Sequence, residues 1–202
     1  DDDLPVDAFM ETCAHTSTVL LLLNEPEWGT QAGLTPDQAA DVIAHYAKRW
    51  PGELWCCGTL SSHPGYLDKI YRSYMARYDD PWPIDGLHIH VYVNDGFRVV
   101  DPLDEHWLAR SKAEVQHYID WLAAHKLPGK IVVSECCLLG EYPTTTYLQV
   151  MDRTVRMLDS FPEVLSVAWF SAFYSPYRHS NLISRHGALT EVGKAWLAQR
   201  WR

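Results

Sequence analysis

The chain has 202 residues, of which 47% are hydrophobic and 12% aromatic, and this composition suits one globular domain with a large core. A formal net charge of −9, without any run of Lys or Arg, argues against nucleic acid or an anionic membrane surface as the partner. No stretch approaches the ~20 apolar residues that a membrane-spanning helix needs. We therefore expect a soluble domain over residues 1–202 that binds a neutral ligand, and leave open whether a full-length form is secreted.

The five cysteines are Cys13, the neighbours Cys56 and Cys57, and the neighbours Cys136 and Cys137. An odd number without CxxC spacing argues against a disulfide framework and against a zinc cluster. Unpaired cysteines behave as small apolar residues and are commonly buried. We therefore predict free thiols in the core.

Apolar strand patterns alternate with helical patterns along the chain. The clearest helix start is Thr35 followed by Pro36, because threonine caps free N–H groups and proline fits the first helical position. The predicted strands are residues 19–24, 53–58, 86–93, 130–135 and 164–172. The predicted helices are the last turns of one over 6–13, and then 36–50, 66–75, 111–125, 147–161 and 190–201.

This alternation is typical of successive βα units, and the α/β fold that we expect is a (β/α)8 barrel of the TIM type. Five strands fall short of the eight that closure needs, so about three initial βα units are expected to be missing, and an open doubly wound sheet is the alternative. We expect the strands to be parallel and adjacent in chain order. The two outer strands would then present apolar edges, which favour self-association.

The apolar run Val19–Leu23 leads directly into Asn24, Glu25 and Pro26. A short, continuous apolar run indicates a strand that is buried on both faces, as in a parallel sheet covered by helices. Proline cannot donate to a sheet ladder, so the strand stops and leaves Glu25 at its C-terminal end. Parallel α/β folds place their chemistry at that end of the sheet.

A second carboxylate, Glu135, ends the apolar strand 130–135. Two carboxylates at the ends of different parallel strands can face each other across the mouth of a barrel. Glycosidases need such a pair, one carboxyl that gives a proton and one ionised nucleophile, about 5 Å apart when the mechanism is retaining. The pair predicts a glycosidase, although a single carboxylate at a strand end is usually solvated or salt-bridged.

His88, His90 and Tyr92 lie two residues apart in the strand 86–93, so their side chains share one face. We expect this polar face to point inward, toward the substrate. Two alternatives stay open. One is a plain structural role, and the other is a metal site in which His88, His90 and Glu135 bind zinc.

Four motifs, in this order and at this spacing, resemble strand ends of clan A glycoside hydrolases. Asn24–Pro26 resembles the Asn-Glu-Pro signature of their strand four, and His88–Tyr92 resembles strand six, where Asn-Ile-His-Ala-Tyr is usual. Val133–Glu135 resembles strand seven, and Ala168–Ser171 resembles strand eight. Within the clan, the whole chain is most similar to the group called glycosyl hydrolase catalytic core, which is related to β-1,3-glucanases.

The resemblance implies roles for these side chains. Glu25 would be the acid/base and Glu135 the nucleophile, with the Tyr92 phenol hydrogen-bonded to the nucleophile. Trp169 would form a platform under the sugar ring, and His90 would contact the substrate and orient the site. The substrate-binding residues that we expect are Asn24, at the sugar 2-hydroxyl, His88, His90, Tyr92 and Trp169.

We therefore expect a retaining glycoside hydrolase that cleaves O-glycosidic bonds of a β-glucan-like polysaccharide without a metal or other cofactor. Its partner would be an oligo- or polysaccharide. The first alternative is a carbohydrate-binding or scaffold protein that keeps the fold without turnover. The second is a metal-dependent hydrolase that uses His88 and His90.

Overall fold

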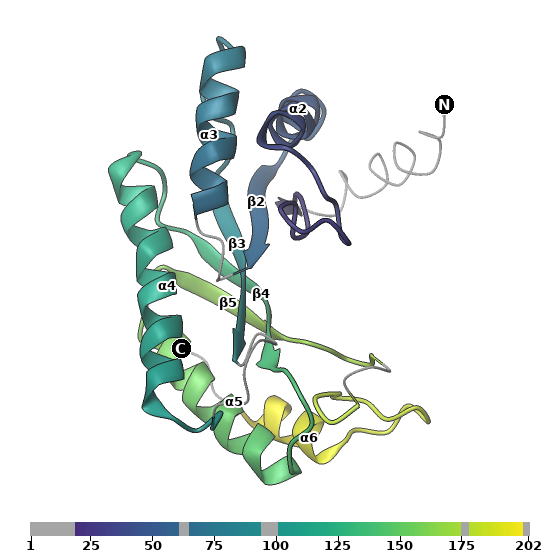
Figure 1. Ribbon diagram of the computed structural model, residues 1–202. Helices are drawn as coiled ribbons and strands as arrows, with labels where there is room; N and C mark the ends of the chain where they lie inside the picture. Colours follow the sequence, from purple (N-terminus) through teal and green to yellow (C-terminus); the bar gives the residue numbers. More distant parts are fainter. Residues whose placement is uncertain (1–18, 61–64, 94–100, 175–177, 200–202) are drawn as a thin grey trace. The chain divides into compact units, whose positions relative to one another are not determined.

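The computed structural model describes residues 19–60, 65–93, 101–174 and 178–199 and, of Cys57 and Leu60, the backbone alone (Figure 1). The predicted helical turns over 6–13 lie outside these residues. Contacts divide the chain into two compact units. The first comprises Asp1–Thr59 and His63–His88, and the second comprises Leu60–Ser62 and Ile89–Arg202.

Among its described residues, the first unit contains two helices and the first strands of the sheet. Its elements are β1 (Val19–Leu21), α2 (Pro36–Ala47), β2 (Glu53–Leu60), α3 (Gly65–Arg77) and the start of β3 (Gly86–Val93). The strands follow chain order, β1-β2-β3, and β1 pairs with β2 in parallel. The core of this unit includes Ile43 on α2, Trp55 on β2 and Ile70 on α3, all of them buried.

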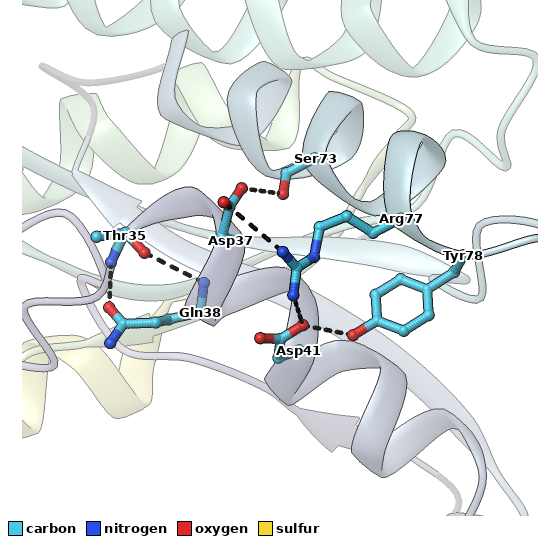
Figure 2. A network of polar contacts seen from close by, with 7 residues as sticks. All are labelled: Thr35, Asp37, Gln38, Asp41, Ser73, Arg77 and Tyr78. Atoms are coloured by element: carbon cyan, nitrogen blue, oxygen red, sulfur yellow. Dashed lines mark hydrogen bonds and ion pairs between the residues drawn. The ribbon is translucent and has the colours of Figure 1, made fainter.

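α2 begins at a capping box (Figure 2). The Thr35 hydroxyl accepts a hydrogen bond from the Gln38 backbone N–H at 3.2 Å, and Gln38 Oε1 accepts from the Thr35 N–H at 2.8 Å. Pro36 occupies the first helical position. These contacts satisfy N–H groups that a helix start leaves unpaired, so the predicted start is confirmed. The helix ends at Ala47, earlier than the predicted 50.

A polar network joins α2 to α3 (Figure 2). Arg77 Nη2 lies 2.6 Å from Asp41 Oδ1, and Arg77 Nη1 lies 3.7 Å from Asp37 Oδ2. Ser73 donates to Asp37, and Tyr78 donates to Asp41. The Tyr78 hydroxyl, and after it Arg77, hold the pKa of the Asp41 carboxyl below its ordinary value. The network therefore favours one register of the two helices while Asp41 is ionised.

The second unit is built around α5. Its elements are the rest of β3, α4 (Glu105–Ala124), β4 (Ile131–Leu138), α5 (Thr144–Asp159), β5 (Val164–Trp169) and α6 (Glu191–Ala198). The strands follow chain order, β3-β4-β5, and β4 pairs with β5 in parallel. α5 contacts α4, α6, β4 and β5. Its buried face, which includes Tyr147, Met151 and Leu158, therefore supplies much of the core of this unit.

The predicted strand order is confirmed, and so is the parallel direction of β1 with β2 and of β4 with β5. The chain thus has the expected α/β fold with a parallel sheet. β3 has its predicted bounds, 86–93. Other predicted ends are wrong: β1 ends at Leu21 and not at 24, β2 at Leu60 and not at 58, β4 at Leu138 and not at 135, and β5 at Trp169 and not at 172.

Side-chain caps mark the starts of α4 and α6. α4 starts at Glu105, earlier than the predicted 111, because Asp104 caps it and accepts from the His106 N–H at 3.0 Å. α6 begins at Glu191 and not at the predicted 190, because Thr190 caps it and its hydroxyl accepts from the Gly193 N–H at 3.0 Å. None of the helices within the described ranges is long and apolar enough to cross a membrane.

The expectation that the first strand is buried on both faces is wrong for β1. Val19 and Leu21 are 37% and 45% exposed, whereas Leu22 is buried. β1 and β5 stand at the two ends of the strand order, so among the described residues each has a neighbouring strand on one side only. Leu165 of β5 is exposed as well. Self-association through these apolar edges stays a prediction.

Candidate active site

Glu25 lies in the turn that follows β1. Its backbone N–H donates to the Gly58 carbonyl oxygen at 3.0 Å, which ties this turn to β2. Leu23 and Glu25 have φ values of 67° and 41°, in the left-handed region that residues other than glycine rarely adopt. Glu25 is half-buried, and Asn24 beside it is exposed. Both side chains therefore follow a strand end, as predicted.

Gly58 and His88 pack against the backbone that leads to Glu25. Gly58 has a φ of +32°, and a Cβ there would lie 2.6 Å from the Leu23 carbonyl oxygen and 2.7 Å from Cε1 of His88. His88 is buried, and its Nε2 lies 2.7 Å from the Leu22 carbonyl oxygen. Because a carbonyl oxygen only accepts, this nitrogen carries the proton and donates.

Glu135 lies inside β4 at an irregularity of the ladder. Val133 is opposite Val167, and Cys136 is opposite Trp169. Three steps along β4 therefore meet two along β5, which is a β-bulge and breaks the alternation of faces. Val133 and Cys136 are fully buried, whereas the Glu135 side chain is 24% exposed. Without the bulge, Glu135 would lie on the same buried face as Val133, two residues earlier. With the bulge, its side chain is partly exposed.

Two side chains of β3 contact Glu135. The Tyr92 hydroxyl donates a hydrogen bond to Oε2 of Glu135, and Nδ1 of His90 lies 3.7 Å from the same oxygen. The hydrogen bond between Tyr92 and Glu135 that the family resemblance implied is therefore confirmed. His90 and Tyr92 are buried, and their rings meet edge to face with centroids 6.0 Å apart. Aromatic packing thus fixes the donor that holds the Glu135 carboxylate.

Trp169, the expected sugar platform, is buried at the end of β5. Its indole N–H donates to the Ser180 carbonyl oxygen at 2.9 Å, and its ring lies 6.0 Å from the ring of Trp196. The next residue, Phe170, packs edge to face with Tyr92. These contacts hold the Trp169 ring in place, and its contact with a sugar stays a prediction.

The histidines of the predicted metal site have different surroundings. His88 uses its protonated Nε2 to donate to the backbone, so this nitrogen does not bind a metal in this state. In the second unit, His90 and Glu135 lie close enough to offer ligand atoms to one ion. A metal role therefore stays an alternative for these two residues, and so does a substrate contact for His88.

Cys136 and Cys137 follow Glu135 directly and are buried free thiols, as is Cys56. The prediction of buried free cysteines is confirmed for these three. Burial raises the pKa of the Cys136 and Cys137 thiols well above the ordinary value. Both thiols stay protonated at neutral pH, so neither supplies a nucleophile or a thiolate ligand beside Glu135.

Sequence reasoning missed Gly58 as a residue of this region. Its signal is present in the sequence, because a glycine in a strand pattern often marks a close approach of another backbone segment. Gly58 ends the predicted strand 53–58, directly after two cysteines. The partner in that approach, the turn at Glu25, is far away in the sequence, so the pattern alone could not name it.

Solved structures share this fold. A GH128 (subgroup II) endo-β-1,3-glucanase from Pseudomonas viridiflava is 23% identical, with a TM-score of 0.70 over 100% of this chain and 77% of that chain. A GH128 (subgroup III) curdlan-specific exo-β-1,3-glucanase from Blastomyces gilchristii, in complex with glucose, is 23% identical, with a TM-score of 0.70 over 98% and 76% of the two chains. A GH128 (subgroup I) endo-β-1,3-glucanase from Amycolatopsis mediterranei, in complex with laminaritriose, is 19% identical, with a TM-score of 0.71 over 94% and 75%.

At these identities the likeness shows the fold alone. Among curated proteins, none matches the sequence. The model of one protein family, described as glycosyl hydrolase catalytic core, matches residues 2–196. This match spans almost the whole chain and agrees with the four motifs at the strand ends. The chain therefore belongs to the glycosyl hydrolase catalytic core family.

Proposed function

We propose that this chain is a retaining β-glucanase in which Glu135 is the nucleophile and Glu25 the acid/base. Glu135 attacks the anomeric carbon while Glu25 gives its proton to the leaving oxygen, so the glycosidic bond breaks and a glycosyl ester forms. Glu25 then takes a proton from water, and the water oxygen displaces Glu135 from the sugar. Over the two steps one water is consumed, one glycosidic bond is broken, and both carboxyl groups return to their starting state without a metal or cofactor.

The observation that carries this proposal is the hydrogen bond from the buried Tyr92 to Glu135, in a chain of a glycosyl hydrolase family. A phenol that donates to one carboxylate oxygen holds the group in one orientation, and Oε1 is then the oxygen that attacks. The bulge at Glu135 supports the same role, because bulges beside active sites re-aim side chains.

We infer a β-1,3-glucan-like polysaccharide as the substrate. Proteins with the same fold include β-1,3-glucanases in complex with laminaritriose or glucose. Asn24, which is exposed beside Glu25, would bind the 2-hydroxyl of the sugar that is attacked. His90 would contact the same sugar, and Trp169 would carry its apolar face.

The test is hydrolysis of a soluble β-1,3-glucan by the purified chain, by Glu25→Gln and by Glu135→Gln. We expect the wild type to release reducing sugar with retained configuration at the anomeric carbon. A glucosyl donor with fluorine at the 2-position forms a long-lived ester, and mass spectrometry of peptides should locate that ester on Glu135. A product of inverted configuration, or a label on another residue, would contradict the mechanism.

The same experiment separates the alternatives. Binding of the glucan without hydrolysis by any of the three proteins would favour the carbohydrate-binding or scaffold alternative. Activity that disappears with a chelator and returns with a divalent metal would favour the metal-dependent alternative through His90 and Glu135. We expect hydrolysis that a chelator does not change.

A further inference from the structure

We propose that Gly58 and His88 are positioning residues that set the direction of the Glu25 side chain. The proposal rests on the proposed function, in which Glu25 is the acid/base. It gives a role in catalysis to a glycine and to a buried histidine through their contacts with the protein backbone. All the contacts that carry it lie in the first unit, around the turn after β1.

Gly58 allows a close approach that a side chain would prevent. Its Cα lies so near the turn that a Cβ would come within 2.6 Å of the Leu23 carbonyl oxygen and within 2.7 Å of His88 Cε1. Neither neighbour is the loose end of a flexible side chain, because one is backbone and the other is a buried ring. A methyl group on Gly58 would therefore push the backbone at Leu23 out of its place.

His88 holds Leu22, the residue directly before Leu23. Its Nε2–H donates to the Leu22 carbonyl oxygen at 2.7 Å, from a ring that is only 4% exposed. The Leu22 N–H donates in turn to the Trp55 carbonyl oxygen of β2, also at 2.7 Å. Leu22 is thus held through both polar groups of its backbone.

The turn between these anchors has an unusual conformation. Leu23 and Glu25 both have positive φ, which is unfavourable for residues with a side chain and persists where surrounding contacts impose it. The Glu25 N–H donates to the Gly58 carbonyl at 3.0 Å, so Gly58 both gives room to the turn and holds its far end. His88 thus holds the turn at Leu22, before Leu23, and Gly58 holds it at Glu25, after Leu23. Together these two contacts determine where the Glu25 Cα–Cβ bond points.

The chemical consequence concerns the leaving group. Proton transfer needs the donor and acceptor atoms within about 2.6–3.2 Å, and a displacement of ~1 Å can slow a reaction about 10²-fold. A sugar alkoxide must receive a proton as it departs, whereas dinitrophenolate departs without one. Misdirection of Glu25 therefore slows cleavage of a glucan and spares the first step on a dinitrophenyl glycoside. A general loss of folding or of substrate binding slows both.

The experiment compares kcat/KM of the full chain on a β-1,3-glucan oligosaccharide and on the dinitrophenyl β-glycoside of a shorter one. Gly58→Ala and His88→Leu should lose about 10²-fold on the oligosaccharide and change little on the dinitrophenyl glycoside. His88→Gln keeps an N–H donor at a similar distance from the backbone and should retain most of the activity. Gly29→Ala is the matched control, because a Cβ on Gly29 would have nothing within 4 Å.

Glu25→Gln is the reference, since it removes the acid itself and should show the same difference between the two substrates. If Glu25→Gln shows that difference and Gly58→Ala and His88→Leu do not, the positioning role is wrong while the proposed function stands. Equal losses on both substrates would overturn the positioning role as well. If the wild type cleaves neither substrate, the proposed function fails, and the positioning role with it. Should Gly58→Ala not fold, the comparison of His88→Leu with His88→Gln decides.

Discussion

Glu25 and Glu135, the two carboxylates that the sequence singled out, are held in different ways. Glu25 follows the end of β1 and is placed by the main chain, through left-handed φ values and a hydrogen bond from its own N–H to Gly58. Glu135 lies within β4 and is held at its carboxylate by the hydroxyl of Tyr92. The contacts described for Glu25 thus fix its main chain, and the contact with Tyr92 reaches the carboxylate of Glu135.

This difference fits the two proposed roles. An acid/base gives up and regains a proton in each turnover, so a support through the backbone does not compete with its chemistry. A nucleophile attacks along one direction and gains from a donor that fixes its orientation. Substitutions at Gly58 and His88 should therefore act by displacing the backbone before Glu25, and substitution of Tyr92 by removing a hydrogen-bond donor to Glu135.

The largest effects should come from the carboxylates themselves. Glu135→Gln should lower kcat about 10⁴–10⁶-fold on every glycoside, because the nucleophile is lost. Glu25→Gln should lower kcat/KM about 10²–10⁴-fold on a glucan and much less on a dinitrophenyl glycoside. Initial rates on both substrates give the comparison, with the exposed Glu141→Gln as control. The same loss on both substrates for the Glu25 and Glu135 variants would contradict separate roles as acid/base and nucleophile.

The next effect should come from the donor beside Glu135. Tyr92→Phe keeps the ring that packs on His90 and removes a hydrogen bond to a charged group, a loss of ~1.5–3 kcal/mol. We expect kcat to fall about 10–10²-fold on both types of substrate, and the thermal unfolding temperature to fall by roughly 3–12 °C without loss of a cooperative transition. Tyr46→Phe on α2 is the matched control. A loss confined to the glucan would place Tyr92 in the acid step and not in nucleophile orientation.

A smaller effect should appear in the stability at high pH. Burial raises the pKa of Cys136 and Cys137 in the folded chain, whereas unfolded thiols ionise near pH 8.5. Above that pH the unfolded chain loses protons that the folded chain keeps, so the free energy of unfolding should fall as the pH rises. One pH unit higher, the fall should reach about 1.4 kcal/mol for each thiol.

Urea unfolding between pH 7 and pH 10 measures this slope, and Cys136→Ala should flatten it. Alkylation of the native chain followed by peptide mapping should leave Cys136 and Cys137 unlabelled, while alkylation in denaturant should label both. Rapid labelling of the native chain would mean that the strand carrying Glu135 opens more readily than its burial indicates.

The smallest effect concerns the network between α2 and α3. Its contacts lower the folded pKa of Asp41, so its contribution to stability is present above the unfolded value of about 3.9 and is lost as the pH falls through the folded value. Asp41→Asn should lower the unfolding temperature at pH 7 by roughly 1–3 °C, since the group is exposed. Thermal scans should show wild type and variant converging at low pH, with the exposed Asp79→Asn as control. A constant difference at every pH would assign the effect to packing and not to charge.

The order of elements could be predicted from the sequence because its signals are local. Hydrophobic periodicity and caps gave the bounds of β3 and the start of α2 at Thr35 and Pro36. The same kind of signal, Asp104 before Glu105, marks the start of α4, whereas the apolar periodicity alone predicts a start at 111. The exposure of Val19 and Leu21 could not be predicted, because a continuous apolar run indicates burial on both faces and does not show which elements cover the strand.

The site was predictable to a different degree in each region. The contact of Tyr92 with Glu135 followed from the family resemblance, and the spacing of residues alone would not have found it. The bulge at Glu135 depends on how β4 pairs with β5, which is a relation between two distant segments. The contact of His88 with Leu22 likewise forms only when two strands distant in the sequence come together. The sequence therefore predicted an inward-facing polar residue at His88 but not its partner.

The bulge in β4 also changes which residues of that strand are buried. Ile131 and Val133 before it are buried, and so are Cys136, Cys137 and Leu138 after it, so burial changes from alternate residues to consecutive ones. Ser134 and Glu135 together stand opposite one residue of β5. Deletion of the Ser134 codon would leave one residue there, and the rest of the strand would still meet β5 in register, with the carboxylate turned away from its present direction. In this chain, loss of a single codon would therefore separate the pairing of β4 with β5 from the direction of the proposed nucleophile.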